Sequence, residues 1–196
     1  MTVHVIQGPD GLTRRAFSVE DVRRMTDAGI MDPDEPIELR DGELIAVPAE
    51  KYAHARATLA MARKLFHALP DKWAIAQEKT LQLSAETLVQ PDFFICASDL
   101  IQGSEEGFLI VPGPDPFIIE VADSSLLHDR TQKSCLYARH DVRGYWIVDL
   151  NGRRILVHRR PEDGEYQDVR SVEAEEVVSP DASGMASFQL RLSDLG

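Results

Sequence analysis

The stretch PFIIEVA at residues 116–122 has the composition of a buried strand with one carboxylate in its middle. A short apolar run of this kind is typical of a strand that is covered on both faces. Alternation along the strand places Glu120 on the same face as Ile118 and Ala122. A carboxylate in that position is costly unless it is paired with a cation, so Glu120 is the first candidate for a functional residue.

A second apolar strand is predicted for PDFFICA at residues 91–97, with Asp92 at its head. Carboxylates on adjacent strands of one sheet can converge on one Mg²⁺ or Mn²⁺, because these hard cations prefer oxygen ligands. The alternative is that Asp92 lies in solvent at a strand end and that Glu120 pairs with an arginine. Either residue alone favours that alternative, whereas the two together, with the lysine described next, favour a metal site.

A helix is predicted from Thr131 to Asp141, after the strand that carries Glu120. Four side chains recur at helical spacing and form one stripe: Asp129, Lys133, Tyr137 and His140. The first turn of this helix is expected to overhang the carboxylates, where Lys133 can orient an attacking water and stabilise charge on a phosphate. The alternatives are an exposed salt bridge between side chains four residues apart and a helix-capping role for Asp129.

Two further helices are predicted in the first part of the chain. Residues 18–29 form a short helix that Ser18 can cap, and residues 51–69 form the longest helical pattern. Residues 1–16 are expected to be irregular.

Two dipeptides predict β-hairpins, because each separates two strand-like runs: Asp41-Gly42 and Asn151-Gly152. Together with the strands and helices above, they predict an α+β or mixed α/β fold. Its expected architecture is a central mixed sheet flanked by helices, with extra β-hairpins at both ends.

The formal net charge of -12 argues against a general nucleic-acid binder, because phosphate contacts use lysine and arginine. The charge is uneven: residues 128–160 hold eight Lys and Arg against three Asp, whereas residues 161–196 hold two Arg against nine acids. The basic stretch is interpreted either as a patch that follows phosphates or as a mixed solvated surface. The acidic stretch is expected to be a C-terminal β extension with one or two weaker strands.

The chain of 196 residues, 43 % of them apolar, suits a single domain over residues 1–196. No apolar run reaches the about 18 residues of a membrane span, and the first residues lack a signal-peptide pattern, so no membrane partner and a cytoplasmic location are expected. Cys96 and Cys135 belong to no CxxC pair and are expected to be free and buried.

The motifs together resemble the bacterial Uma-type family of restriction endonucleases, within the PD-(D/E)XK nuclease superfamily. The resemblance rests on PD at 91–92, EVADSS at 120–125, DRTQK at 129–133, LYARHDV at 136–142 and YWIVDL at 145–150, with IELRDGEL at 37–44 and His54 upstream. It covers roughly residues 35–160 and implies that this part is a restriction-endonuclease-like core.

This resemblance implies that Asp92 and Glu120 are the metal ligands and that Lys133 assists the chemistry. The lysine of the superfamily normally lies two residues after the glutamate, where this chain has Ala122, and the family carries its lysine on the following helix instead. Gly144 departs from the pattern, since the family usually has a glutamate before the YW pair.

Four residues are second-tier candidates: Glu38, Glu43, His54 and Glu78. Glu38 lies in a strand and is predicted to supply a third carboxylate. His54 is the other added catalytic candidate, although a histidine at a helix start more often has a purely structural role. Exposure on a hairpin is favoured for Glu43, and Glu78 can face the site or the solvent.

The predicted function is hydrolysis of DNA phosphodiester bonds with Mg²⁺ or Mn²⁺ bound by Asp92 and Glu120. Cutting both strands of a duplex favours a homodimer. Two alternatives stay open. One is a non-catalytic binding or regulatory module that keeps the fold, which the negative charge favours. The other is a hydrolase of small phosphoesters, which the salt dependence of activity would distinguish from a DNA enzyme.

Overall fold

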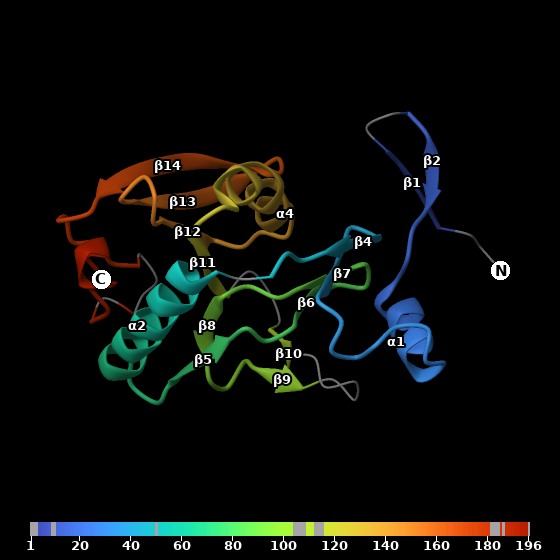
Figure 1. The fold of residues 1–196 in the computed structure, drawn as a ribbon, viewed down its shortest axis with the longest axis horizontal. Coiled ribbons are helices and arrows are strands. Elements are labelled where there is room, and N and C mark those ends of the chain that lie inside the picture. The colour runs from blue at the N-terminus through green and yellow to red at the C-terminus, as the bar shows by residue number, and fades with distance from the viewer. Residues whose placement is uncertain are drawn as a thin grey trace. The chain divides into compact units, whose positions relative to one another are not determined.

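The computed structural model describes residues 4–8, 11–49, 51–103, 109–111, 116–180, 185 and 187–195. Contacts divide the chain into two compact units. The smaller unit comprises residues 1–49, 80–90 and 103–110, and the larger unit comprises residues 50–79, 91–102 and 111–196. Both units are built from separate segments, so the chain passes several times from one to the other (Figure 1).

The smaller unit begins with a hairpin of β1 (Val5–Gln7) and β2 (Thr13–Arg15), followed by α1 (Val19–Asp27). The expectation that residues 1–16 are irregular is therefore wrong. Each strand has only three residues and little apolar alternation, which leaves no periodic signal. The helix is confirmed, including its cap: the Ser18 hydroxyl accepts the Asp21 backbone N–H, and the Asp21 carboxylate accepts the Ser18 N–H.

The predicted hairpin at Asp41-Gly42 joins β3 (Ile37–Arg40) to β4 (Glu43–Ala46). Both turn residues have positive φ, 47° for Asp41 and 87° for Gly42, as a two-residue hairpin turn requires. These strands join β7 (Thr87–Val89), β6 (Leu81–Ser84), β10 (Leu109–Ile110) and β9 (Gln102–Gly103) in one six-stranded sheet, in the order β4-β3-β7-β6-β10-β9.

The larger unit is built on a second six-stranded sheet, so the described part of the chain holds two large sheets where one was expected. Its order is β14 (Glu165–Glu173), β13 (Arg154–Glu162), β12 (Gly144–Asp149), β11 (Phe117–Ala122), β8 (Phe93–Ala97) and β5 (Trp73–Gln77). β11 and β12 are parallel, and the other neighbours are antiparallel. The mixed α/β class is thus confirmed.

One face of this sheet is covered by α2 (Tyr52–Ala68) and by the C-terminal segment with its 3₁₀ turn (Leu192–Leu195). Met61 and Leu65 of α2 pack in one apolar cluster with Ile119 of β11 and with Phe188. The parallel connection from β11 to β12 contains α3 (Leu126–His128), a π-helical turn (Asp129–Lys133) and α4 (Ser134–Arg139), which contacts β13 and β14 (Figure 1). This helical stretch begins earlier than the predicted Thr131.

The acidic extension contains a strand, as expected, but this strand is long rather than weak. β14 is a full nine-residue strand that pairs along β13 through a two-residue turn at Asp163 (φ 52°) and Gly164 (φ 79°). The second predicted hairpin, between β12 and β13, is confirmed, but the positive φ falls on Arg153 (50°) rather than on Asn151 or Gly152. Asp149 holds this loop, because its carboxylate accepts the Gly152 N–H at 2.7 Å.

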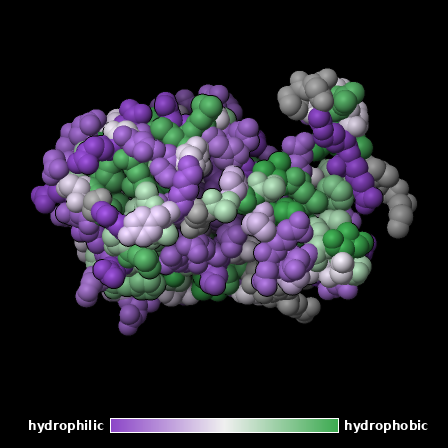
Figure 2. Space-filling model, viewed as in Figure 1, coloured by the Kyte–Doolittle hydropathy of each residue, from purple (hydrophilic) through white to green (hydrophobic). Residues whose placement is uncertain are grey.

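Within the described ranges, none of the helices combines the length and the apolar character that a membrane span requires. Figure 2 shows hydrophilic and hydrophobic residues interspersed on the visible face of the larger unit. Both cysteines are free, as expected; Cys96 is buried and Cys135 is half-buried.

Candidate active site

Asp92 lies directly before β8, at the point where the ladder between β8 and β11 stops. The last backbone pair of that ladder joins Phe93 to Ile119. Beyond it the Oδ2 atom of Asp92 accepts the backbone N–H of Val121 at 2.5 Å, so a side-chain carboxylate takes over the acceptor role of a strand. Asp92 is 7 % exposed, which excludes the alternative of a solvated strand end. The Asp92 carboxylate therefore lies beside β11, the strand that carries Glu120.

His54 joins Asp92 from the first turn of α2. Its Nε2 atom lies 3.1 Å from both carboxylate oxygens of Asp92, and the ring is buried. Thr58, one turn along α2, is also buried and donates its hydroxyl to the His54 carbonyl. The second-tier candidate His54 is thus in direct contact with a first-tier one.

Glu120 lies in the middle of β11 and is 4 % exposed. Its Oε1 atom accepts two hydrogen bonds, one from the Lys133 ammonium at 2.7 Å and one from the Tyr137 hydroxyl at 2.7 Å. The ion pair of Glu120 with Lys133 is formed with a lysine and not with the arginine of the alternative. Two charge-assisted donors on one oxygen fix the orientation of this carboxylate.

The π-helical turn brings Lys133 to Glu120. Asp129 and Lys133, at its two ends, are both buried, so the predicted stripe is a packed face and not an exposed salt bridge. Asp129 accepts the Ser125 hydroxyl at 2.6 Å, and its backbone carbonyl accepts the Tyr145 hydroxyl at 3.2 Å. π-turns of this kind are rare and occur frequently at functional sites.

The electrostatics of these residues show that three carboxylates influence one buried region. Burial raises the pKa of Asp129, Lys133 opposes the rise, and the charge of Asp92 adds to it. Burial also raises the pKa of Tyr145, and the nearby charges of Glu120, Asp129 and Asp92 raise it further. Such a concentration of negative charge favours a bound cation.

The donor atoms suit a hard divalent cation. Asp92 and Glu120 offer carboxylate oxygens from neighbouring strands, the ligand type that Mg²⁺ and Mn²⁺ prefer. Within the part of the chain that the structure describes, no three His, Cys, Asp or Glu side chains are placed to hold one ion. Two carboxylates are sufficient for Mg²⁺, which is commonly bound by one or two carboxylates together with water and substrate phosphate.

The other second-tier residues, Glu38, Glu43 and Glu78, differ in their burial and in their contacts. Glu38 belongs to the smaller unit, where its buried carboxylate is bound by Arg40 and accepts the Gln90 backbone N–H at 2.9 Å. Glu43 is half-buried in β4. Glu78 is exposed after β5, and its backbone N–H donates to the Asp92 carbonyl at 3.1 Å.

Asp129 is the residue that the sequence interpretation undervalued. A helix-capping role was the alternative to its place in the stripe, and the structure puts it at the start of the π-turn with its carboxylate buried. Its signal was present, since it forms one stripe with Lys133 and Tyr137. Tyr145 and Trp146 of β12 are both buried.

Comparison with known proteins supports this assignment of elements. Residues 19–193 match the sequence profile of the family Uma2, which is described as "Putative restriction endonuclease". Among solved structures, a "putative nuclease belonging to DUF820" from Anabaena variabilis ATCC 29413 is similar, with a TM-score of 0.69 and 17 % sequence identity over 91 % of this chain and 97 % of that chain. At this identity the likeness establishes the fold alone. No curated protein matches the sequence.

The profile covers the strand with Asp92, the strand with Glu120 and the helical stretch with Lys133. The resemblance noted in the sequence is therefore confirmed over a longer span than residues 35–160, and the chain belongs to the Uma2 family.

Proposed function

We propose that this protein is a metal-dependent endonuclease that hydrolyses DNA phosphodiester bonds at the cluster of Asp92, Glu120 and Lys133. The observation that carries the proposal is the buried contact of 2.7 Å between Lys133 and Glu120, beside a second buried carboxylate at the head of the next strand. The superfamily's lysine lies two residues after the glutamate, where this chain has Ala122. Lys133 contacts Glu120 from the following helical stretch instead, so we propose that it takes the role of that lysine.

Asp92 and Glu120 would hold Mg²⁺ or Mn²⁺. The chemistry that such an ion would supply there is polarisation of the scissile phosphate and a lowered pKa of a water. The chain itself orients the two carboxylates: the Val121 N–H and His54 hold Asp92, and Lys133 and Tyr137 hold Glu120. Lys133 would donate to the water or to the charged phosphate oxygens during the reaction.

DNA is the proposed substrate because the family is described by that chemistry. The net charge of -12 opposes non-specific binding to a duplex, so contacts must come from the local excess of cations in residues 128–160. A cytoplasmic location belongs to the same proposal. So does a homodimer, since two sites related by a two-fold axis suit the cutting of both strands of a duplex.

The decisive experiment compares metal binding and DNA cleavage in the same variants. Calorimetric titration of Mn²⁺ into the wild type should show binding that disappears in the Asp92→Ala/Glu120→Ala double variant, and cleavage of supercoiled plasmid should disappear with it. Glu165→Gln, which removes an exposed carboxylate from β14, is the control and should change neither.

Three outcomes would contradict the proposal. Cleavage by the double variant at the wild-type rate would remove the assigned residues from the reaction. Metal binding without cleavage of any nucleic acid would favour a binding or regulatory module. Hydrolysis of a small phosphodiester that does not weaken with salt, without DNA cleavage, would identify a phosphoesterase, because DNA binding falls steeply with salt.

A further inference from the structure

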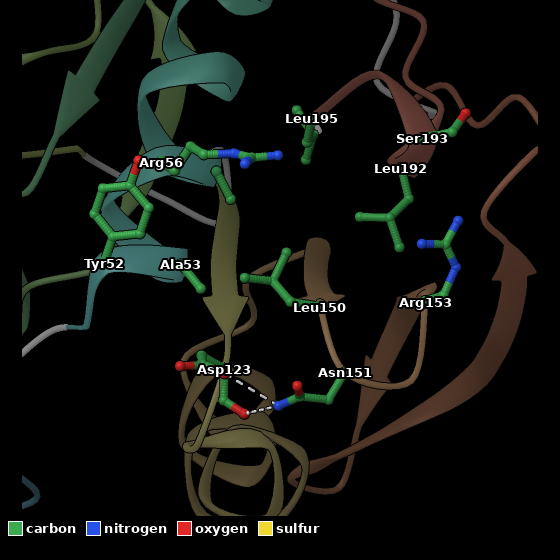
Figure 3. A pocket seen from close by; sticks show the side chains of 11 residues that line it. Tyr52, Ala53, Arg56, Asp123, Leu150, Asn151, Arg153, Leu192, Ser193 and Leu195 are labelled. Carbon is green, nitrogen blue, oxygen red and sulfur yellow. Dashed lines mark hydrogen bonds between the residues drawn. The ribbon is translucent and has the colours of Figure 1, made fainter.

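The larger unit contains a cavity of about 380 Å³ that the proposed reaction does not use. It lies where the carboxyl end of β11, the loop from β12 to β13, the first turns of α2 and the C-terminal 3₁₀ turn meet (Figure 3). Polar and charged side chains line one part of it: Tyr52, Arg56, Asp123, Asn151, Arg153 and Ser193. Leu150, Leu192 and Leu195 line another part.

Two arginines in this cavity have no side-chain partner in the described part of the chain. No hydrogen bond or ion pair among those residues engages the side chain of Arg56 or Arg153. By contrast, Arg154, next along the chain, is paired with Asp149 at 3.0 Å. In Figure 3 the Arg56 side chain extends from α2 into the opening, and Arg153 rises from the loop beside Leu192. Two such guanidinium groups at one cavity suit an anion, and a phosphate above all.

The loop holds Arg153 in a conformation that arginine does not favour. Its φ is 50°, in the left-handed region where glycine is preferred. The flanking residues are locked: Asn151 donates to the carbonyl and to the carboxylate of Asp123, and a Cβ on Gly152 would collide with the Asp149 carboxylate. These contacts hold the backbone of the loop at Arg153 in one conformation.

The remaining lining indicates what the phosphate is attached to. Tyr52 is 82 % exposed at the α2 side of the opening and offers an aromatic face on which a base can stack. The cavity also follows on the proposed active site. Asp123 comes directly after β11, about 10 Å along the strand from Glu120. Ala53, another lining residue, precedes His54, which contacts Asp92.

We infer that this cavity binds one nucleotide of a nucleic-acid strand, with its phosphate on Arg56 and Arg153 and its base on Tyr52. The inference rests on the proposed nuclease function and extends it, because it assigns a position for a nucleotide that flanks the cleaved bond. Binding of the nucleotide needs no metal and no cleavage.

The test is the binding of thymidine 5′-monophosphate to the full chain in EDTA, followed by NMR. Arg153→Gly and Arg56→Ala should each weaken binding about tenfold, the effect expected for one charge-assisted hydrogen bond. Because glycine suits a positive φ, Arg153→Gly should unfold at the same temperature as the wild type or higher, so its loss of binding cannot arise from unfolding. Arg153→Asn, which also tolerates this backbone, should behave alike.

Matched controls come from the same unit. Arg160 is exposed and has a φ of 54°, and Arg63 is exposed on α2, so Arg160→Gly and Arg63→Ala remove the same charges outside the cavity and should leave binding unchanged. Tyr52→Leu should weaken thymidine 5′-monophosphate but not inorganic phosphate.

The inference is overturned if the Arg153 and Arg56 variants bind the nucleotide as the wild type does, or if their controls lose as much affinity. Inorganic phosphate that binds as tightly as the nucleotide would overturn the assignment of a base to Tyr52. Failure of the nuclease proposal would give a different result. Cleavage and Mn²⁺ binding would then be absent from the wild type, whereas binding of thymidine 5′-monophosphate in EDTA would persist.

Discussion

The ammonium nitrogen of Lys133 lies 2.7 Å from the Oε1 atom of Glu120, and both residues are buried. This contact joins the middle of β11 to the end of the π-helical turn. A buried ion pair contributes little net stability when compared with an apolar pair, but removal of one partner leaves an uncompensated charge. The structural and the chemical roles of Lys133 can therefore be separated by substitution.

Lys133→Met should destabilise the protein by about 3–5 kcal/mol and abolish DNA cleavage, because it removes the ammonium group that contacts the buried Glu120 carboxylate. In the Lys133→Met/Glu120→Gln double variant most of that stability should return, while cleavage stays absent. Urea unfolding and plasmid cleavage measure the two quantities. Cleavage by the double variant would show that the pair is structural only.

Asp92→Asn should keep the stability of the fold but lose metal binding. In Asp92→Asn the side-chain amide would still offer an oxygen to the Val121 N–H, so the free energy of unfolding should change by about 1 kcal/mol or less, whereas Asp92→Ala leaves that N–H unsatisfied and should cost about 1–3 kcal/mol. Both variants should lose Mn²⁺ binding in calorimetry. Retention of the metal by Asp92→Asn would exclude Asp92 as a charged ligand.

Asp129→Asn should stabilise the protein at neutral pH. Burial raises the pKa of Asp129, so the folded state retains a proton that the unfolded state has lost, and the stability of the wild type falls as pH rises through the raised pKa. Asparagine can still accept the Ser125 hydroxyl. The advantage of the variant should therefore grow as pH rises above 3.8, the ordinary value, and vanish in acid. Urea unfolding from acid to neutral pH tests this, and an equal advantage at every pH would contradict it.

The strands that carry Asp92 and Glu120 could be predicted from their apolar runs. The two carboxylates could be chosen as candidates because a charge inside such a run is costly unless it is paired or bound to a cation. Asp92, Glu120 and Lys133 lie together, as the resemblance implied, although their roles stay predictions. The contact between His54 and Asp92 spans 38 positions of the sequence, and no local pattern specifies it. The burial of Asp129 depends on the π-turn, whose register does not follow from helical spacing.

Missed elements have particular causes. β1, β2 and β7 have three residues each, too few for alternation to be visible. Asp163-Gly164 carries the same hairpin signal as Asp41-Gly42, but the acidic composition around it favoured a weak strand. Pairing with the full length of β13 outweighs that composition, because Tyr166 and Val172 of β14 are buried while Glu165 and Glu173 are exposed.

The last prediction concerns His158, which is buried on β13 with its ring 5.2 Å from that of Tyr145 and 5.4 Å from that of Tyr166. Burial lowers the pKa of His158 from 6.5 to about 4. Between pH 6.5 and about 4 the unfolded state binds a proton at His158 and the folded state does not. The contribution of neutral His158 to the free energy of unfolding is therefore complete above pH 6.5 and is lost as pH falls towards 4. The loss amounts to about 3 kcal/mol.

His158→Phe keeps an aromatic ring and removes the titration, so its free energy of unfolding should fall less than that of the wild type between pH 6.5 and about 4. The control is His67→Gln, which changes an exposed histidine on α2 and should follow the wild type. Parallel curves for the wild type and His158→Phe would show that His158 is not responsible for the loss of stability in acid.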